Sequence, residues 1–384
     1  MIRTYKYRLY PNRVQKELLD KLLEIHRSLY NDALTERRIA WKRCRVSVSY
    51  YAQANQLTAS RAIDDDLAFA NYSSLQHTMR RLAKSFASFF RRVKAGQTPG
   101  YPRYKGRKRF DSFEYTYGDG CKLRLGQRIC FYIQNVGELR IKYHRPVPDT
   151  IKHVIIKRSL GKWYACLQWK APDTIAPVHD GPAVGIDMGL HHLLALSDDT
   201  FVENPRWLRG SLLHLRVAQR RLARRKRGSH RRHKAAFQVA RRHERVSNQR
   251  RDIWHKVTTE LVQTYSLIAI EDLPLAFMTH NRSLALSTHD AGLGMFKAML
   301  AYKAEEAGTL LILVNPRNTS QMCSSCGSIV PKGLSVREHV CPTCGLIIDR
   351  DTNAACNILE LARTGPSGHK VSGYAMPVLR SFPL

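Results

Sequence analysis

The sequence predicts a multi-domain chain that joins a β-rich half to an α/β half. Short β-like runs between residues 122 and 169, separated by Gly, Asn or Pro turns, indicate the first half. Two apolar strands that end in carboxylates, at 183–189 and 267–272, indicate the second. Paired CxxCG motifs between residues 323 and 345 predict a small metal-binding insertion. The length of 384 residues suffices for two or three such domains.

The chain is strongly basic, with 63 Lys and Arg against 31 Asp and Glu residues and a net charge of +32. Such an excess repels itself unless a polyanion neutralises it, so we expect a nucleic-acid partner. No run approaches the ~18 apolar residues of a membrane-spanning helix, and residues 1–12 lack a signal-peptide core. Five of the nine cysteines lie outside the CxxCG motifs without a pairing pattern. This usage fits a reducing compartment and a cytoplasmic protein.

The N-terminal half begins with a strand at residues 4–10, where aromatic or apolar side chains alternate with polar and basic ones. Pro11 and Asn12 then predict a helix cap. Apolar residues at helical spacing predict helices at 13–42 and 67–93, the second with a cationic side. The later β-like runs predict an antiparallel, barrel-like sheet. We expect the first strand to join that sheet, which makes the helices an insertion. The runs are 122–125, 129–133, 138–141, 153–158 and 163–169.

Residues 96–110 interrupt the helical pattern with Gly and Pro and interleave aromatic with basic side chains. Cations on a mobile loop can follow phosphates, and aromatic rings can stack on unpaired bases. A solvated basic linker is the alternative. The candidate nucleic-acid contacts are Tyr101, Arg103, Tyr104, Lys105 and Arg107.

A Pro-rich linker at 172–182 precedes the α/β half, whose first strand, 183–189, carries Asp187. Residues 193–196 and 200–203 are expected to form its next strands. A second apolar strand ends in Glu271. A lone Asp in a strand is usually a turn or cap residue, but the repeated pattern favours a shared role. Parallel strands place their carboxyl ends at one sheet edge, so we expect these two acids to converge.

Between those strands, residues 206–256 hold eighteen Arg or Lys residues and two acids. A narrow apolar stripe predicts two helices joined near Gly228 and Ser229. A charge run is often only a solvated face, yet this many like charges favour contact with phosphates. The histidines in this stretch are better explained as polar surface than as metal ligands, because their neighbours are cations. The candidate contacts are Arg220, Arg221, Arg224, Arg225, Lys226 and Arg227.

The two CxxCG motifs are separated by fourteen residues between the inner cysteines. Each Gly lets the backbone fold back so that two sulfurs face one tetrahedral ion. Chance placement of reduced cysteines rarely produces this spacing twice. We therefore expect one structural Zn²⁺ bound by Cys323, Cys326, Cys341 and Cys344.

A helix at 290–306, a strand at 310–314, the cysteine insertion and a final helix complete the order of an RNase H-like α/β core. The final helix starts at an acidic turn that contains Asp349 and Asp351. Asp187, Glu271 and one of these two acids could hold two divalent ions for phosphodiester hydrolysis. Either Asp can be the ligand and the other the helix cap, and the sequence leaves this choice open.

The motifs G-I-D-M-G, I-E-D-L, C-S-S-C-G, C-P-T-C-G and D-R-D-T-N-A-A-C-N-I together resemble those of the TnpB (OrfB) proteins of bacterial insertion sequences, which are related to type V CRISPR effectors. The blocks Y-R-L-Y-P, G-Y-P-R-Y-K and R-L-A-R-R-K-R-G-S extend the resemblance over roughly residues 1–361. It implies an RNA-guided DNA endonuclease that associates with the bacterial nucleoid. It also implies that Asp351, beside x-N-A-A, is the third catalytic acid.

The resemblance further implies a layout and a set of partners. These are a guide RNA from the transposon end and a double-stranded DNA target next to a short motif, with one protein copy per RNA or a dimer. The catalytic ions would be two Mg²⁺, with Mn²⁺ as a substitute. Tyr51, Gln76 and Thr116 match positions that touch the motif. The layout is a β-barrel wedge domain (1–10 and 96–175), a helical recognition lobe (11–95), a RuvC-like nuclease domain (176–317 and 347–363), a zinc ribbon (318–346) and a disordered tail (364–384).

Two other functions remain open from the sequence. The chain could bind nucleic acid without cutting it, as a transposition accessory or an RNA-guided repressor. A DDE-type transposase would use three acids in a similar way to join strands, but without RNA. Retention of all three acids favours a nuclease.

Overall fold

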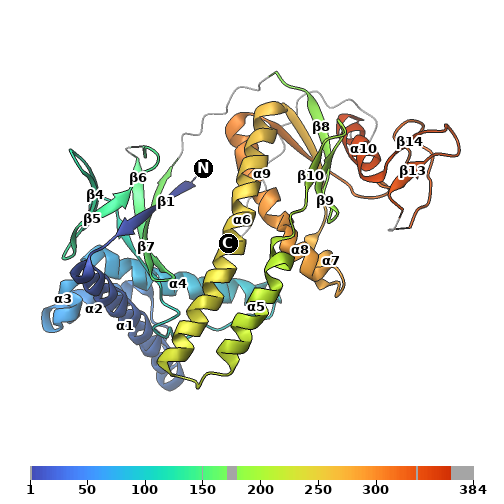
Figure 1. Ribbon diagram of the computed structural model, residues 1–384. Coiled ribbons are helices and arrows are strands. Elements are labelled where there is room, and N and C mark those ends of the chain that lie inside the picture. The colour runs from blue at the N-terminus through green and yellow to red at the C-terminus, as the bar shows by residue number, and fades with distance from the viewer. Residues whose placement is uncertain (1, 149, 171–179, 334–335, 365–384) are drawn as a thin grey trace. The chain divides into compact units, whose positions relative to one another are not determined.

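The computed structural model describes residues 2–148, 150–170, 180–333 and 336–364, and Figure 1 traces the chain. The chain forms two compact units, Met1–Asp173 and Thr174–Leu384. The tail predicted at 364–384 lies outside the described residues except for Thr364, which ends a helix. Most of the predicted linker at 172–182 lies outside them too.

The N-terminal unit contains a seven-stranded antiparallel sheet of order β2-β6-β7-β1-β5-β4-β3. The first strand pairs with β7 on one side and β5 on the other, so it joins the later strands as predicted. Within the described residues no ladder joins β2 to β3, so the sheet is open rather than a closed barrel. The strands are β1 (Ile2–Tyr10), β2 (Ser112–Thr116), β3 (Cys121–Leu125), β4 (Ile129–Ile133), β5 (Gly137–Lys142), β6 (Ile151–Ser159) and β7 (Lys162–Lys170).

Four helices lie between β1 and β2: α1 (Arg13–Cys44), α2 (Tyr50–Ile63), α3 (Asp65–Phe69) and α4 (Tyr72–Lys94). Asn12 caps α1 as predicted, and its side chain accepts a hydrogen bond from the Gln15 backbone. The single helix expected at 67–93 is wrong, because the side chain of Asn71 accepts from the Ser74 backbone and starts α4 there. Helix α2 and strand β2 were not predicted.

The C-terminal unit contains a five-stranded sheet of order β10-β9-β8-β11-β12. Strands β8, β11 and β12 are parallel, β9 pairs antiparallel with β8, and β10 pairs antiparallel with β9. The pairing of β9 with the strand that carries Asp187 is as expected from the sequence. The strands are β8 (Ala183–Asp187), β9 (His192–Leu196), β10 (Phe201–Glu203), β11 (Leu267–Glu271) and β12 (Leu310–Val314).

Helices cover both faces of this sheet. The long basic pair α5 (Trp207–Ala223) and α6 (His230–Thr264) matches the two helices predicted around Gly228. The short helices α7 (Leu275–His280) and α8 (Ala285–Ala291) were not predicted and precede α9 (Leu293–Ala307). Figure 1 shows the hairpin of β13 (Glu338–Val340) and β14 (Ile347–Asp349) leading into α10 (Arg350–Thr364).

The two faces of the sheet bury different side chains, because successive residues of a strand point to opposite sides. Ile186 and Ile270 belong to the large core that includes Trp254 of α6 and Phe296 of α9. On the opposite face, Ala269 packs with Ile358 and Ala362 of α10. Asp187 and Glu271 follow Ile186 and Ile270 and therefore lie on the α10 face.

Helix α10 approaches β8 at Gly185 more closely than any side chain would permit. A Cβ atom at this position would lie 2.1 Å from the Ala355 carbonyl oxygen and 2.7 Å from the Leu359 nitrogen. Both of these atoms belong to the helix backbone, which cannot move aside as a flexible side chain can. Gly185 thus sets the depth at which α10 lies on the sheet.

We predict that Gly185→Ala destabilises the chain by about 1–3 kcal/mol, since the added methyl group displaces the backbone of α10. Gly210→Ala is the matched control, because Gly210 lies in α5 and a Cβ added there would meet nothing within 4 Å. It should be neutral or stabilise by up to about 1 kcal/mol. Chemical unfolding followed by circular dichroism measures both, and equal stability of the two variants would contradict the role of Gly185.

Candidate active site

Two of the predicted acids end neighbouring parallel strands. Ile186 of β8 pairs with Ile270 of β11, so Asp187 and Glu271, the next residue of each strand, lie side by side. Adjacent strands are about 4.8 Å apart. The convergence of strand ends expected from the sequence is therefore present.

The third acid comes from the first turn of α10. Asp351 precedes Ala355 by four residues and therefore lies on the same side of the helix, the side that meets Gly185. Burial, followed by repulsion from Glu271 and Asp351, raises the pKa of Asp187 to about 8. Glu271 and Asp351 are thus both near enough to Asp187 to raise its pKa. Among the described residues the three acids do not form a group with all ligand atoms within 4.8 Å.

The two acids at the start of α10 have different partners. The side chain of Asp349 accepts hydrogen bonds from the backbone nitrogens of Asp351, at 2.8 Å, and Thr352, at 3.1 Å. Asp349 therefore caps the helix. The Asp351 carboxylate lies 3.8 Å from the guanidinium of Arg337. This difference separates two acids that the sequence left equivalent.

Glu271 is buried and held in place by Thr319, whose hydroxyl donates a hydrogen bond of 2.5 Å to Oε1. Burial raises the pKa of the Glu271 carboxyl. The ammonium group of Lys297 donates to the backbone oxygens of Glu271 and Leu273, at 2.9 and 3.2 Å. Thr319 and Lys297 were missed, because neither stands in a recognisable spacing to the acids.

Two buried asparagines join α10 to the chain segment that enters the cysteine cluster. Asn353 accepts from the Ser324 nitrogen at 2.9 Å and donates to the Met322 oxygen at 2.8 Å. Asn357 donates to the Met322 and Thr319 oxygens, at 2.7 and 2.9 Å. These residues were also missed as site residues, although asparagines four apart in an apolar helix stripe could have indicated them.

The four predicted cysteines form one cluster, with all sulfur atoms within 4.8 Å of one another. The sulfurs of Cys323 and Cys344 lie 3.6 Å apart, as do those of Cys326 and Cys341. A tetrahedral zinc site with Zn–S bonds of about 2.3 Å requires about 3.8 Å. The cluster therefore fits one zinc ion. A hydrogen bond with the Ser328 side chain lowers the pKa of Cys326 to about 6, which favours the thiolate form of this ligand.

Both knuckles of the cluster have the same backbone geometry. Gly327 and Gly345 have φ values of 75° and 76° and donate to the carbonyl oxygens of Cys323 and Cys341. This left-handed conformation explains why glycine follows each CxxC pair.

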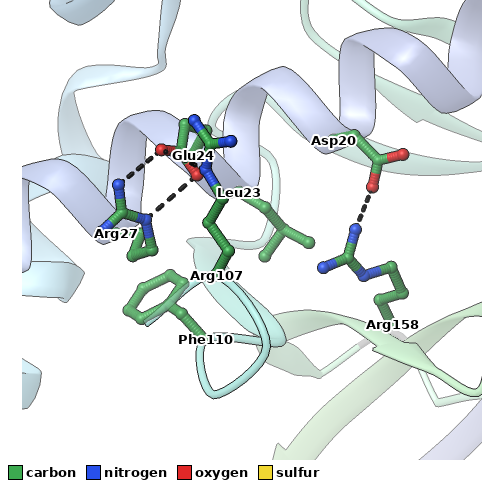
Figure 2. Close-up of a pocket in the computed structure, with 7 residues that line it drawn as sticks. All are labelled: Asp20, Leu23, Glu24, Arg27, Arg107, Phe110 and Arg158. Atoms are coloured by element: carbon green, nitrogen blue, oxygen red, sulfur yellow. Dashed lines mark hydrogen bonds and ion pairs between the residues drawn. The ribbon is translucent and has the colours of Figure 1, made fainter. Parts of the chain in front are cut away.

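The segment 96–110 does not form the free loop expected from the sequence. Asn31 of α1 binds both the nitrogen and the carbonyl oxygen of Lys105, at 2.8 and 3.0 Å. Nε of Arg107 lies 3.2 Å from Oε1 of Glu24, at the edge of a cavity of about 300 Å³. Figure 2 shows the two side chains beside each other. Tyr101 and Tyr104 lie near the guanidinium of Arg38. The segment is therefore anchored at Lys105 and Arg107, and the side chains of Tyr101, Arg103, Tyr104 and Arg107 are exposed.

The remaining predicted contacts lie on α2, α4, β2, and α5 with the turn that follows it. The basic set at the end of α5 and in the turn to α6 is exposed: Arg220, Arg221, Arg224, Arg225, Lys226 and Arg227. Gln76 of α4 precedes His77, whose Nε2 lies 3.0 Å from the hydroxyl oxygen of Thr116 of β2. Tyr51 is 76% exposed on α2, next to Tyr50, which accepts a hydrogen bond from Arg80 of α4.

None of the described helices is long and apolar enough to cross a membrane.

Comparison with known proteins identifies the family. The OrfB_IS605 model, described as "Probable transposase", matches residues 167–282, and models described as "Cas12f1-like, TNB domain" and "Helix-turn-helix domain" match 294–358 and 1–45. A Streptomyces pristinaespiralis protein named "Putative RNA-guided DNA endonuclease" is 35% identical over 93% of this chain and 88% of its own length. The chain belongs to the OrfB (TnpB) family. Here the helix-turn-helix match covers β1 and the single helix α1.

Two further similarities extend over most of this OrfB chain. The protein "Putative RNA-guided DNA endonuclease InsQ" of Escherichia coli (strain K12) is 28% identical over 100% of this chain and 96% of its own. The structure titled "Structure of the mini-RNA-guided endonuclease CRISPR-Cas_phi3" has a TM-score of 0.59 and 8% identity, covering 94% of this chain and 92% of that one. At this identity the structural likeness concerns the fold alone.

We predict that, in the absence of divalent ions, Asp187→Asn stabilises the chain at pH 8. The raised pKa means that Asp187 contributes stability below pH ~4, and this contribution is lost as the pH rises through about 8. The variant should therefore be more stable by about 1–3 kcal/mol at pH 8, with a smaller difference at pH 5. Chemical unfolding at the two pH values measures this. A difference that does not depend on pH would show that Asp187 is ionised normally.

Proposed function

We propose that this OrfB-family chain is an RNA-guided DNA endonuclease with a RuvC-like nuclease domain in its C-terminal unit. The observation that carries the proposal is that Asp187 and Glu271 end two adjacent parallel strands on the α10 face of the sheet, where Asp351 is near enough to raise the pKa of Asp187. Buried acids that repel one another are poor structural elements but good ligands for hard cations. Two relatives whose names describe RNA-guided DNA endonucleases support the same activity.

The three carboxylates would hold two Mg²⁺ ions, for which Mn²⁺ could substitute. Two ions held there by Asp187, Glu271 and Asp351 would supply activation of a water and stabilisation of the departing 3′ oxygen in phosphodiester hydrolysis. The protein's contribution is positioning. Thr319 orients Glu271, Gly185 sets the depth of α10, and Asp349 caps the helix that presents Asp351.

The four-cysteine cluster would hold one structural Zn²⁺ as a ribbon spanning 318–346. Its role in the nuclease is to fix the start of α10, because the ribbon strand β14 runs directly into that helix. Asn353 adds a second link between the two, through Ser324 and Met322. Loss of the zinc ion would therefore change the position of Asp351.

The partners would be a guide RNA from the transposon end and a double-stranded DNA target, with the cytoplasm and nucleoid as the site of action. Base pairing with the guide selects the sequence, and basic side chains follow the phosphate backbone. In this proposal β1 and the later strands form the wedge domain, and α1–α4 form the recognition lobe. Tyr51, Gln76 and Thr116 would contact the motif beside the target. Either one protein copy or a dimer would bind each RNA.

We predict that Asp187→Ala abolishes DNA cleavage while nucleic-acid binding is kept. RNA that copurifies with the full-length protein is sequenced to define the guide, and a plasmid with the matching target is incubated with Mg²⁺. Cleavage should fall by roughly 10³-fold or more, with RNA and DNA affinity within about twofold of wild type, because only ion binding is lost. Asp252→Asn, an exposed acid of α6, is the matched control and should cut normally.

Each failure of this experiment points to a different function. Wild-type protein that binds a defined RNA but does not cut would be a transposition accessory or repressor. Binding of transposon ends without any defined RNA would indicate a DDE-type transposase. Cleavage by Asp187→Ala at the wild-type rate would contradict the assignment of the acids.

We predict that Cys323→Ser lowers cleavage by roughly tenfold or more, because a loosened ribbon no longer fixes Asp351. Asn353→Ala should reduce cleavage in the same direction while its zinc content stays at the wild-type value. Cys44→Ser, at the exposed end of α1, is the control and should change neither quantity. Zinc content and Mg²⁺-dependent cleavage are measured together, and unchanged cleavage in Cys323→Ser would refute the coupling.

A further inference from the structure

A second group of metal-ligand side chains lies in the N-terminal unit, on three different elements. His77 comes from α4, Glu114 from β2 and His153 from β6. One ligand atom from each lies within 4.8 Å of the others. Neither the cysteine cluster nor the three acids share a residue with this group. We propose that His77, Glu114 and His153 form a binding site for one divalent transition-metal ion, with zinc as the ion that best fits it.

The spacing of the three side chains suits coordination better than direct hydrogen bonding. Oε1 of Glu114 lies 3.9 Å from Nδ1 of His77 and 3.7 Å from Nδ1 of His153. Both distances are longer than a normal hydrogen bond of about 2.7–3.2 Å. Ligands about 2.0–2.1 Å from a tetrahedral ion lie about 3.3 Å apart. Shortening the two Glu114–histidine distances by about half an ångström would therefore bring these pairs to the spacing of metal ligands.

A histidine nitrogen atom without a hydrogen-bond partner supports the binding of an ion. Nδ1 of His153 is buried and makes no hydrogen bond within the described residues. A buried polar nitrogen without a partner is costly, so a bound ion would remove a penalty that the protein alone leaves in place. The two imidazole rings are perpendicular, with centroids 5.4 Å apart.

The second ligand is oriented by its other ring nitrogen. Nε2 of His77 lies 3.0 Å from the hydroxyl oxygen of Thr116. When Nε2 donates this hydrogen bond, Nδ1 keeps a lone pair directed at Glu114, which is the arrangement usual for metal-bound histidines.

The site stands on paired strands and a packed helix. Thr116 pairs with His153 and Glu114 with Ile155 across β2 and β6, so Glu114 and His153 are diagonal neighbours on one face of the sheet. Three cations, Arg80, Arg81 and Lys84, are near enough to act on His77 or Glu114, and two of them have hydrogen-bond partners outside the site. Arg80 donates to the Tyr50 hydroxyl at 2.9 Å, and Arg81 to the Ser112 carbonyl oxygen at 2.8 Å.

The donor set identifies the class of ion. Two imidazole nitrogens and one carboxylate suit Zn²⁺, Fe²⁺ or Ni²⁺, whereas Mg²⁺ prefers oxygen ligands throughout. Three protein ligands leave a fourth position open. A bound ion would tie α4 to β2 and β6 beside Gln76 and Thr116, and its effect on motif recognition rests on the proposed function. Binding of the ion does not rest on it.

The test counts zinc in the full-length, untagged chain after dialysis against micromolar ZnCl₂. An organomercurial reagent then releases only the zinc held by thiolates. The wild type should hold two zinc ions per chain, one released by the reagent and one retained. His153→Gln and Glu114→Gln should each hold one, all of it released. Circular dichroism verifies that both variants are folded.

His192→Gln is the matched control, because His192 pairs with Glu203 at 2.9 Å without a third ligand in the described chain. It should still hold two zinc ions. A wild-type count of one, or a retained ion that persists in both site variants, would overturn the proposal. These outcomes do not depend on cleavage, so failure here is distinguishable from failure of the nuclease assignment.

Discussion

The closeness of α10 to the backbone of β8 is the constraint on which the C-terminal unit depends. Because residue 185 has no side chain, the helix lies directly on the strand, with the Ala355 carbonyl over the place where a Cβ would be. That contact brings the first turn of α10 to the strand ends. Asp349 and Asn353 then hold this turn in place, one as a cap and one through the segment leading to the cysteines.

The local charges of the acidic site and the charge of the whole chain act on different scales. Two carboxylates about 5 Å apart repel by about 3 kcal/mol at an effective dielectric constant of 20. The excess positive charge on the exposed helices is screened beyond about 8–10 Å. The net charge of +32 therefore has little effect on the pKa of Asp187. Only nearby cations can offset the repulsion. Arg350 lowers the pKa of Asp187, yet burial and the two neighbouring acids outweigh it.

The sequence was a good guide wherever periodicity and spacing carry the information. The sequence predicts the two strands that end in Asp187 and Glu271, because the alternation of side chains in a strand can be recognised within a few residues. It predicts the cysteine cluster for a similar reason, since the CxxCG spacing reflects tetrahedral metal coordination. Features made by distant partners were not predictable in this way. The segment at 96–110 is held by Asn31 of α1, and Glu271 is oriented by Thr319, neither of which follows a spacing rule. Helix α2 was missed because its apolar stripe is weak and its buried set includes Gln53.

The continuous passage from β14 into α10 has a consequence for exchanging parts between relatives. Asp349 ends the strand and Arg350 begins the helix, so no linker exists there to absorb a change in length. A chimera that replaces only residues 318–346 would change the partners of Asn353 and Asn357 while keeping the asparagines themselves. The segment exchanged between relatives must therefore be longer. It should begin at Thr319 and end at Asn357, so that it includes the first turns of α10 together with the hydrogen-bond partners of both asparagines.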